Sequence, residues 1–110
     1  MPADRMPEPP ARRSNRERSY VVAYDISDPK RWRRVFRLMK GYGQWLQLSL
    51  FQCRLSGARR AEMAMRLEEL IARKEDHVLI LDLGPADDAA IVVESLGKAF
   101  TPIERHAIII

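Results

Sequence analysis

The feature that most constrains the fold is a short apolar segment that ends in a carboxylate and leads into a helix start. Residues 20–26 read Tyr-Val-Val-Ala-Tyr-Asp-Ile, and Asp28 and Pro29 follow closely. An apolar run of this length is typical of a strand covered on both sides of a sheet. Asp is a preferred helix N-cap and Pro suits the first helical position. A helix is therefore expected from about Pro29 to Gly41, with Asp25 at the junction.

The segment after this helix alternates in hydrophobicity, but the alternation changes phase. Leu46 and Leu48 share one parity, and Phe51 and Cys53 share the other. A slip of one residue turns side chains to the opposite face of a sheet. We therefore expect a bulge or break near Leu50 and Phe51, which divides residues 44–55 into two short strands.

The remaining periodicities complete a β-α-β-β-α-β order with extra C-terminal strands. The further elements are a helix over about 58–74, a strand over 77–83 closed by Gly84-Pro85, and a last strand over 107–110. Residues 86–100 carry both helix and strand signals. This order predicts an α+β, ferredoxin-like sandwich with its helices on one face of an antiparallel sheet. The apolar end of the chain is expected to pair with another strand, for example across a homodimer.

Composition indicates one folded domain behind a polar tail. Residues 1–18 are rich in proline and charge and are expected to be disordered, which leaves residues 19–110 for the ferredoxin-like domain. The arginines of the tail could touch a nucleic acid backbone, although a solubilising tail or a later start at Met6 fits equally well.

Cys53 is the single cysteine, which favours a reducing, cytoplasmic setting. No apolar run reaches the ~20 residues that cross a bilayer, so no membrane partner is expected.

The charges of the first helix suggest a polyanionic partner. The chain carries a net charge of +4, and residues 30–40 contain six cationic side chains and no acidic one. Arg33, Arg34 and Arg37 are candidates to neutralise phosphates, and an ordinary solvated helix face is the alternative. Asp25 beside them could hold Mg²⁺, a cation that takes oxygen ligands and often only one or two carboxylates. The alternative role for Asp25 is to cap a turn.

Several motifs in this order resemble the CRISPR-associated protein 2 family. They are Tyr24-Asp25-Ile26-Ser27-Asp28, the arginine-rich segment 31–37, Gly43, Gln47-Leu48-Ser49-Leu50-Phe51-Gln52-Cys53, Glu94-Ser95-Leu96-Gly97 and Ile108-Ile109-Ile110. Members of that family typically read as a strand ending in Tyr-Asp, an arginine-rich helix and a Gln-x-Ser-Val-Phe-type segment. The resemblance covers about residues 19–110. Leu48 departs from it, because an aromatic residue is common at that position.

The resemblance implies a homodimer whose C-terminal strands complete the partner's sheet, and a role in CRISPR spacer acquisition beside the integrase, CRISPR-associated protein 1. Some members of the family are described as metal-dependent endonucleases on RNA or double-stranded DNA. By this resemblance Asp25 is the catalytic and metal-binding residue, and two copies share one Mg²⁺. Ser49 and Phe51 correspond to the Ser and Phe of the family segment, and Arg31 and Arg34 to its basic helix residues.

Two sets of alternatives stay open at the sequence level. Tyr24 and Phe51 could assist at the site or belong to the core, and Ser49 could contact phosphate or sit at the strand break. The function could be that of a Mg²⁺-dependent endonuclease, of a non-catalytic DNA-binding scaffold for the integrase, or of a toxin-type ribonuclease outside CRISPR. The sequence lacks HExxH, P-loop, zinc-binding Cys and Gly-x-Ser-x-Gly patterns, which removes the commoner hydrolase classes.

Overall fold

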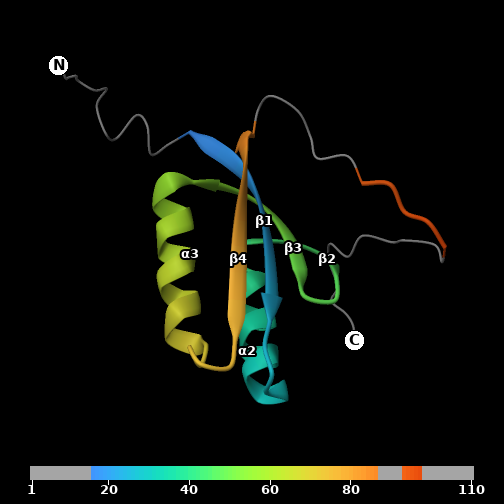
Figure 1. The fold of residues 1–110 in the computed structure, drawn as a ribbon. Helices are drawn as coiled ribbons and strands as arrows, with labels where there is room; N and C mark the ends of the chain where they lie inside the picture. Colours follow the sequence, from blue (N-terminus) through green and yellow to red (C-terminus); the bar gives the residue numbers. More distant parts are fainter. Residues whose placement is uncertain (1–15, 87–92, 98–110) are drawn as a thin grey trace.

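The computed structural model describes residues 16–86 and 93–97. Within them the elements are β1 (Glu17–Asp25), α2 (Pro29–Met39), β2 (Gly43–Gln47), β3 (Leu50–Ser56), α3 (Gly57–Leu70) and β4 (His77–Pro85) (Figure 1). This is the predicted β-α-β-β-α-β order. Most of the tail expected over 1–18, and the final strand expected over 107–110, lie outside the described residues.

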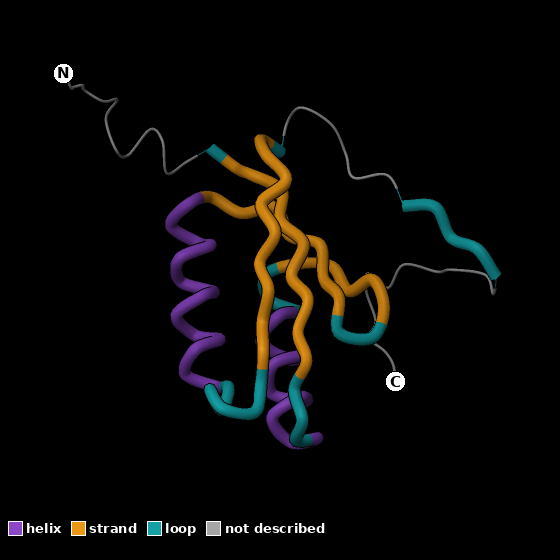
Figure 2. The backbone as a smooth tube through the Cα atoms, in the orientation of Figure 1, coloured by secondary structure: helices purple, strands orange, loops and turns teal. Residues whose placement is uncertain are grey.

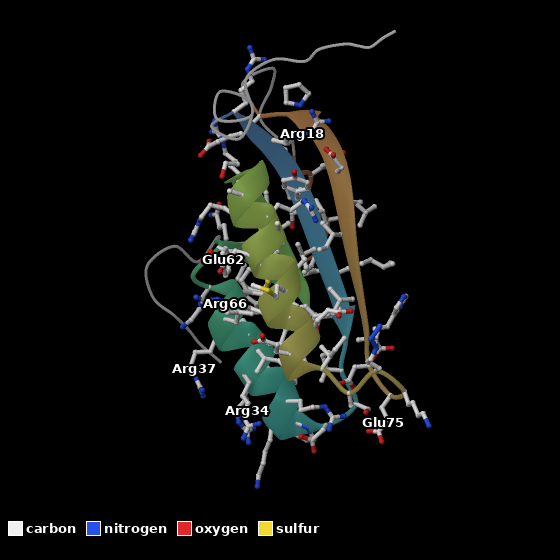
Figure 3. All side chains as sticks on the ribbon, turned by 90° about the vertical axis from the view of Figure 1, so that its left-hand side faces the viewer. Arg18, Arg34, Arg37, Glu62, Arg66 and Glu75 are labelled. Carbon is white, nitrogen blue, oxygen red and sulfur yellow. The ribbon has the colours of Figure 1, made fainter. Side chains whose placement is uncertain are left out.

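The strands form one antiparallel sheet in the order β2-β3-β1-β4. β1 and β3 are central, and α2 and α3 lie together in a second layer on one side of the sheet (Figures 2 and 3). The architecture confirms the predicted α+β, ferredoxin-like class, in which helices cover one face of an antiparallel sheet. Asp25 lies at the end of a central strand, where β1 leads into α2.

β1 begins at Glu17, two residues before the expected domain start at residue 19. Arg18, which composition placed in the tail, pairs instead with β4: its Nε lies 3.0 Å from Asp82 Oδ1 and 3.1 Å from Asp82 Oδ2. The backbone N–H of Ala86 also donates to the Glu17 carbonyl at 3.0 Å. Long-range pairing with β4 therefore extends the strand into a polar segment that has no strand signal of its own.

Both helices begin where local sequence predicts but end earlier. Asp28 caps α2, its Oδ2 accepting the Arg31 backbone N–H at 2.9 Å. α2 ends at Met39 rather than at Gly41, and α3 ends at Leu70 rather than at residue 74. The backbone N–H of Ala72 donates to the Asp76 carboxylate at 2.8 Å instead of continuing the helix. A carboxylate four residues further along the chain thus accepts from Ala72, and α3 ends about one turn before the expected residue 74.

The expected break between β2 and β3 is confirmed as a tight turn. Leu48 and Ser49 separate the strands, and Leu48 has a φ of 44°, in the left-handed region that non-glycine residues rarely adopt. The register between β2 and β3 also shifts between Trp45 and Gln47. The Trp45 Nε1–H donates to the Leu48 carbonyl at 2.8 Å and holds the turn.

The core lies between the sheet and the helices. Its fully buried side chains include Phe51, Met39, Met63, Val22, Val35 and Cys53. Burial raises the pKa of the Cys53 thiol to about 11, so this side chain is a packed apolar group and not a nucleophile.

The described helices cover β1 on one face only, which corrects the expectation of a strand covered on both sides. Val22 and Tyr24 are buried against the helices, whereas Val21 and Ala23 remain half-buried on the opposite face. In β4 the residues beside them, Leu79 and Leu81, are 50% and 45% exposed. An apolar run shows that both faces are apolar, but within residues 16–86 and 93–97 helices cover only one of them.

Replacing Gly43 with Ala is expected to destabilise the fold by about 2 kcal/mol. A Cβ at Gly43 would meet Cys53 Sγ and lie 2.5 Å from the Gln52 carbonyl oxygen, so β2 and β3 would have to separate. Gly57→Ala is the matched control, because a Cβ there meets nothing within 4 Å at the start of α3. Urea unfolding should show a lower midpoint for Gly43→Ala and an unchanged or higher one for Gly57→Ala. Equal midpoints for the two variants would contradict the expected clash.

Candidate metal and nucleic-acid site

Asp25 is an exposed carboxylate held by a rigid backbone. It is the last residue of β1 and lies opposite His77, the first residue of β4, in the antiparallel ladder. Within the described part of the chain its carboxylate makes no hydrogen bond and no ion pair with another side chain. A carboxylate that the described residues leave without a partner can bind a cation or a ligand from solution.

The loop after Asp25 is held by a second carboxylate, that of Asp76 between α3 and β4. Asp76 Oδ1 accepts the Ser27 backbone N–H at 3.1 Å, and Asp76 Oδ2 accepts from Arg31 Nε at 2.7 Å. The Asp76 side chain is fully shielded from solvent. The Arg31 guanidinium and the backbone N–H groups of Ala72 and Ser27 hold the pKa of the Asp76 carboxyl well below its usual range.

Arg31 differs from the other arginines of α2, because its guanidinium is engaged by acidic groups. Its Nη2 lies 3.0 Å from Glu75 Oε1 and 3.2 Å from Asp76 Oδ1. The hydrogen bond to Asp76 is the main cause that raises the pKa of Arg31. The structure therefore places Arg31 beside Asp25 as part of the framework that holds the loop.

Arg33, Arg34 and Arg37 are exposed on α2. Among the described residues none of their guanidinium groups takes part in an ion pair. Arg34 and Arg37 extend outward from α2 on the helical side of the molecule (Figure 3). By contrast, Arg66 of α3 lies 3.7 Å from Glu62. Arg33, Arg34 and Arg37 are thus available to bind phosphates, and the helix that carries them follows directly after β1.

The aromatic residues of the quoted motifs, Tyr24 and Phe51, face the core. Phe51 is fully buried and stacks on Tyr24, with ring centroids 6.3 Å apart. Tyr24 is also buried, which raises the pKa of its hydroxyl, and that hydroxyl has no hydrogen-bond partner among the described residues. Neither ring is placed to stack on a base, so any contribution to the site goes through packing behind Asp25.

Ser49 lies at the turn between β2 and β3 and links it to α2. Its Oγ accepts the Trp32 Nε1–H at 2.7 Å, and its carbonyl accepts the Tyr24 backbone N–H at 3.1 Å. Through these contacts Ser49 holds the turn against β1. The β1 residue that it contacts, Tyr24, directly precedes Asp25. Its hydroxyl proton remains available to a phosphate, because the contact with Trp32 uses only an oxygen lone pair.

Asp25 is the candidate metal ligand of the described residues. No group of three or more potential His, Cys, Asp or Glu ligands is found in the described ranges 16–86 and 93–97. Asp25 offers hard oxygen ligands, which suits Mg²⁺, a cation commonly bound by one or two carboxylates and several waters. The chemistry of this carboxylate is thus compatible with Mg²⁺, and further oxygen ligands would have to come from water or from another molecule.

No pattern in the sequence indicated the roles of Asp76 and Glu75. They lie more than forty positions from Arg31, and their spacing matches no local motif. The charge pattern showed six cations on the first helix but could not show that one of them is already paired.

In the described residues, no helix is long and apolar enough to cross a membrane.

Comparison with known proteins identifies the family. The family model for CRISPR associated protein Cas2 matches residues 18–91. A protein of Rhodospirillum rubrum named CRISPR-associated endoribonuclease Cas2 1 is 70% identical over 99 residues, which are 90% of this chain and 97% of that protein. A Geobacter sulfurreducens protein named CRISPR-associated endoribonuclease Cas2 is 52% identical over 94 residues, covering 86% of this chain and 99% of its own length.

Solved structures agree with this result. A crystal structure described as cas2 is 31% identical and superposes with a TM-score of 0.67, covering 83% of this chain and 99% of its own. The structure of a hypothetical protein from Thermus thermophilus is 33% identical, with a TM-score of 0.64 and coverage of 79% and 99%. The strand order, the two helices and the matched length therefore place this chain in the CRISPR-associated Cas2 family.

Proposed function

We propose that this protein is a homodimeric, Mg²⁺-dependent endonuclease of a CRISPR system, which hydrolyses phosphodiester bonds in RNA or double-stranded DNA at a pair of Asp25 carboxylates. The observation that carries the proposal is the exposed Asp25 at the end of a central strand, which has no side-chain partner among the described residues and leads directly into the helix that carries exposed arginines. The names of the relatives from R. rubrum and G. sulfurreducens, both endoribonucleases, support the same class of reaction. We further propose that it acts in the cytoplasm beside the CRISPR integrase, CRISPR-associated protein 1.

Each residue has a distinct task in this proposal. Arg33, Arg34 and Arg37 neutralise backbone phosphates and orient the strand without reading its bases. Asp25 supplies oxygen ligands at the position where the scissile phosphate arrives. Asp25 would hold the magnesium ion, which would supply Lewis-acid chemistry: polarisation of a phosphoryl oxygen and a lowered pKa of coordinated water. The Ser49 hydroxyl donates a hydrogen bond to a neighbouring phosphate. Cation binding is the task of Asp25.

The homodimer is supported by the uncovered face of the sheet. Val21 and Ala23 on β1 and Leu79 and Leu81 on β4 form a partly exposed apolar strip that the helices do not reach. Burying such a strip against a second copy removes apolar surface from water. A two-fold interface also presents the same residue twice, so it supplies two Asp25 side chains to one site.

A second function, that of a non-catalytic DNA scaffold for the integrase, is favoured by one observation. The exposed arginines of α2 can bind phosphates whether or not Asp25 takes part in chemistry. The family match favours either of these functions over a toxin-type ribonuclease outside CRISPR.

The experiment that separates the two functions is cleavage and binding measured in the same samples. The purified protein is incubated with single-stranded RNA and with double-stranded DNA, each in Mg²⁺ and in EDTA. We expect cutting of at least one substrate in Mg²⁺ and none in EDTA, with binding under both conditions. Salt-sensitive binding without cutting of either substrate would support the scaffold and contradict the nuclease.

A further inference from the structure

The Asp76 carboxylate collects donors from three separate segments of the chain. Oδ1 accepts from the Ser27 N–H at 3.1 Å, the Ser27 hydroxyl at 3.4 Å and Arg31 Nη2 at 3.2 Å. Oδ2 accepts from Arg31 Nε at 2.7 Å and from the Ala72 N–H at 2.8 Å. A shielded carboxylate with this many donors has one well-defined position, because each hydrogen bond restricts it further.

These contacts meet at the end of the sheet that carries Asp25. Asp76 directly precedes His77, whose Cα is the ladder partner of Asp25. Ser27 lies two residues after Asp25 in the connection to α2, and Arg31 lies in the first turns of that helix. Asp25 is therefore held on one side by the β1–β4 ladder and on the other by the Ser27 contacts with Asp76.

Asp25 needs such support because its own carboxylate has no partner within the described residues. A metal-binding carboxylate is effective only if its backbone and neighbouring loop hold it close to the productive geometry. Arg31 belongs to the same arrangement, since its ion pairs with Asp76 and Glu75 join α2 to the loop before β4. None of these contacts involves the free arginines of α2.

We propose that Asp76, together with Arg31, is a positioning residue for the Asp25 site: it holds the Ser27 segment and the start of α2 so that Asp25 meets its metal ion at a fixed place. This inference rests on the proposed function, since it concerns the metal site of Asp25. It reassigns Arg31 from a phosphate contact to the framework of the site.

Asp76→Asn is the variant that tests the proposal. Its side chain keeps the size of Asp76 but replaces one acceptor oxygen with an N–H₂ donor, which would face the donors of Arg31, Ser27 or Ala72. We expect Mn²⁺, titrated as a probe and followed by electron paramagnetic resonance, to bind about 10-fold more weakly than to the unmodified protein. The Mg²⁺ concentration for half-maximal cleavage should rise by a similar factor, and the Ser27 amide should exchange faster with solvent.

Asp82→Asn is the matched control. Asp82 lies in β4 and, like Asp76, accepts two hydrogen bonds from one arginine, here Arg18. It lies toward the end of β4 that is far from Asp25. Its substitution should leave Mn²⁺ affinity and Mg²⁺ dependence unchanged. If Asp76→Asn fails to fold, Arg31→Lys replaces it, because lysine keeps the charge and loses the two-pronged contact with Asp76. Arg31→Lys should also weaken Mn²⁺ binding relative to the unmodified protein.

The outcomes distinguish this inference from the function on which it rests. If Mn²⁺ binds in a way that requires Asp25, and folded Asp76→Asn or Arg31→Lys binds it as tightly as the unmodified protein, Asp76 is only structural and the inference is overturned. A lowered melting temperature with unchanged metal affinity has the same meaning. If the unmodified protein shows no Asp25-dependent Mn²⁺ binding, the metal site itself is wrong and both proposals fall.

Discussion

Asp25→Asn is expected to reduce Mg²⁺-dependent cleavage by at least about 100-fold while leaving nucleic acid binding in EDTA within about twofold. The amide keeps the size of the side chain but removes the negative charge that attracts the cation. Because Asp25 is exposed and makes no hydrogen bond with the described residues, its substitution should not disturb the fold. Rates and affinities are measured on the same preparations, with circular dichroism to confirm folding.

Asp28→Asn is the control for Asp25, because it removes a neighbouring carboxylate without removing the helix cap. Asp28 Oδ2 accepts the Arg31 N–H at 2.9 Å, and asparagine caps helices about as well as aspartate. Cleavage by Asp28→Asn should stay within about threefold of the unmodified protein. A loss as large as that of Asp25→Asn would indicate that general negative charge at this end, and not Asp25, is what the reaction needs.

Mixed dimers test whether the two Asp25 side chains act as one site. Equal amounts of unmodified and Asp25→Asn protein, unfolded and refolded together, should form about half heterodimers if subunits pair at random. If both carboxylates are required, the mixture retains about one quarter of the activity. Retention of about one half would show that each Asp25 works alone and would contradict a shared cation.

The second large effect is expected for nucleic acid binding when Arg33, Arg34 and Arg37 are replaced together by Gln. Three phosphate contacts per chain would be lost, so affinity at low salt should fall by roughly 10- to 100-fold. The slope of log affinity against log salt should become shallower by about 2 to 3 on duplex DNA and about 2 on a single strand, counted per chain. Fluorescence anisotropy at several salt concentrations measures both quantities.

A control triple variant with the same change in charge is available on other parts of the chain. Arg18, Arg54 and Arg73 are already paired with Asp82, Glu17 and Glu68 respectively. Replacing these three with Gln should change affinity and salt slope much less than the α2 triple variant does. If both triple variants weaken binding equally, the attraction comes from net charge and not from the exposed arginines of α2.

The parts of the fold that depend on neighbours in sequence were predictable. Asp28 and Pro29 set the start of α2, because capping and the fixed φ of proline act within one turn. The change of apolar parity predicted the break between β2 and β3, because side chains alternate strictly along a strand. The position of Asp25 at the end of β1 follows from the same local reasoning.

The sequence by itself thus determined the order of the elements, the strand break and the placement of Asp25 beside a basic helix, since periodicity and capping are local properties. The tertiary structure alone decided which face of β1 the described helices cover and which arginine of α2 is engaged. The ion pair of Arg31 with Asp76, at 2.7 Å, joins residues 45 positions apart. Such a contact depends on how the helices pack on the sheet, and no spacing along the chain encodes it.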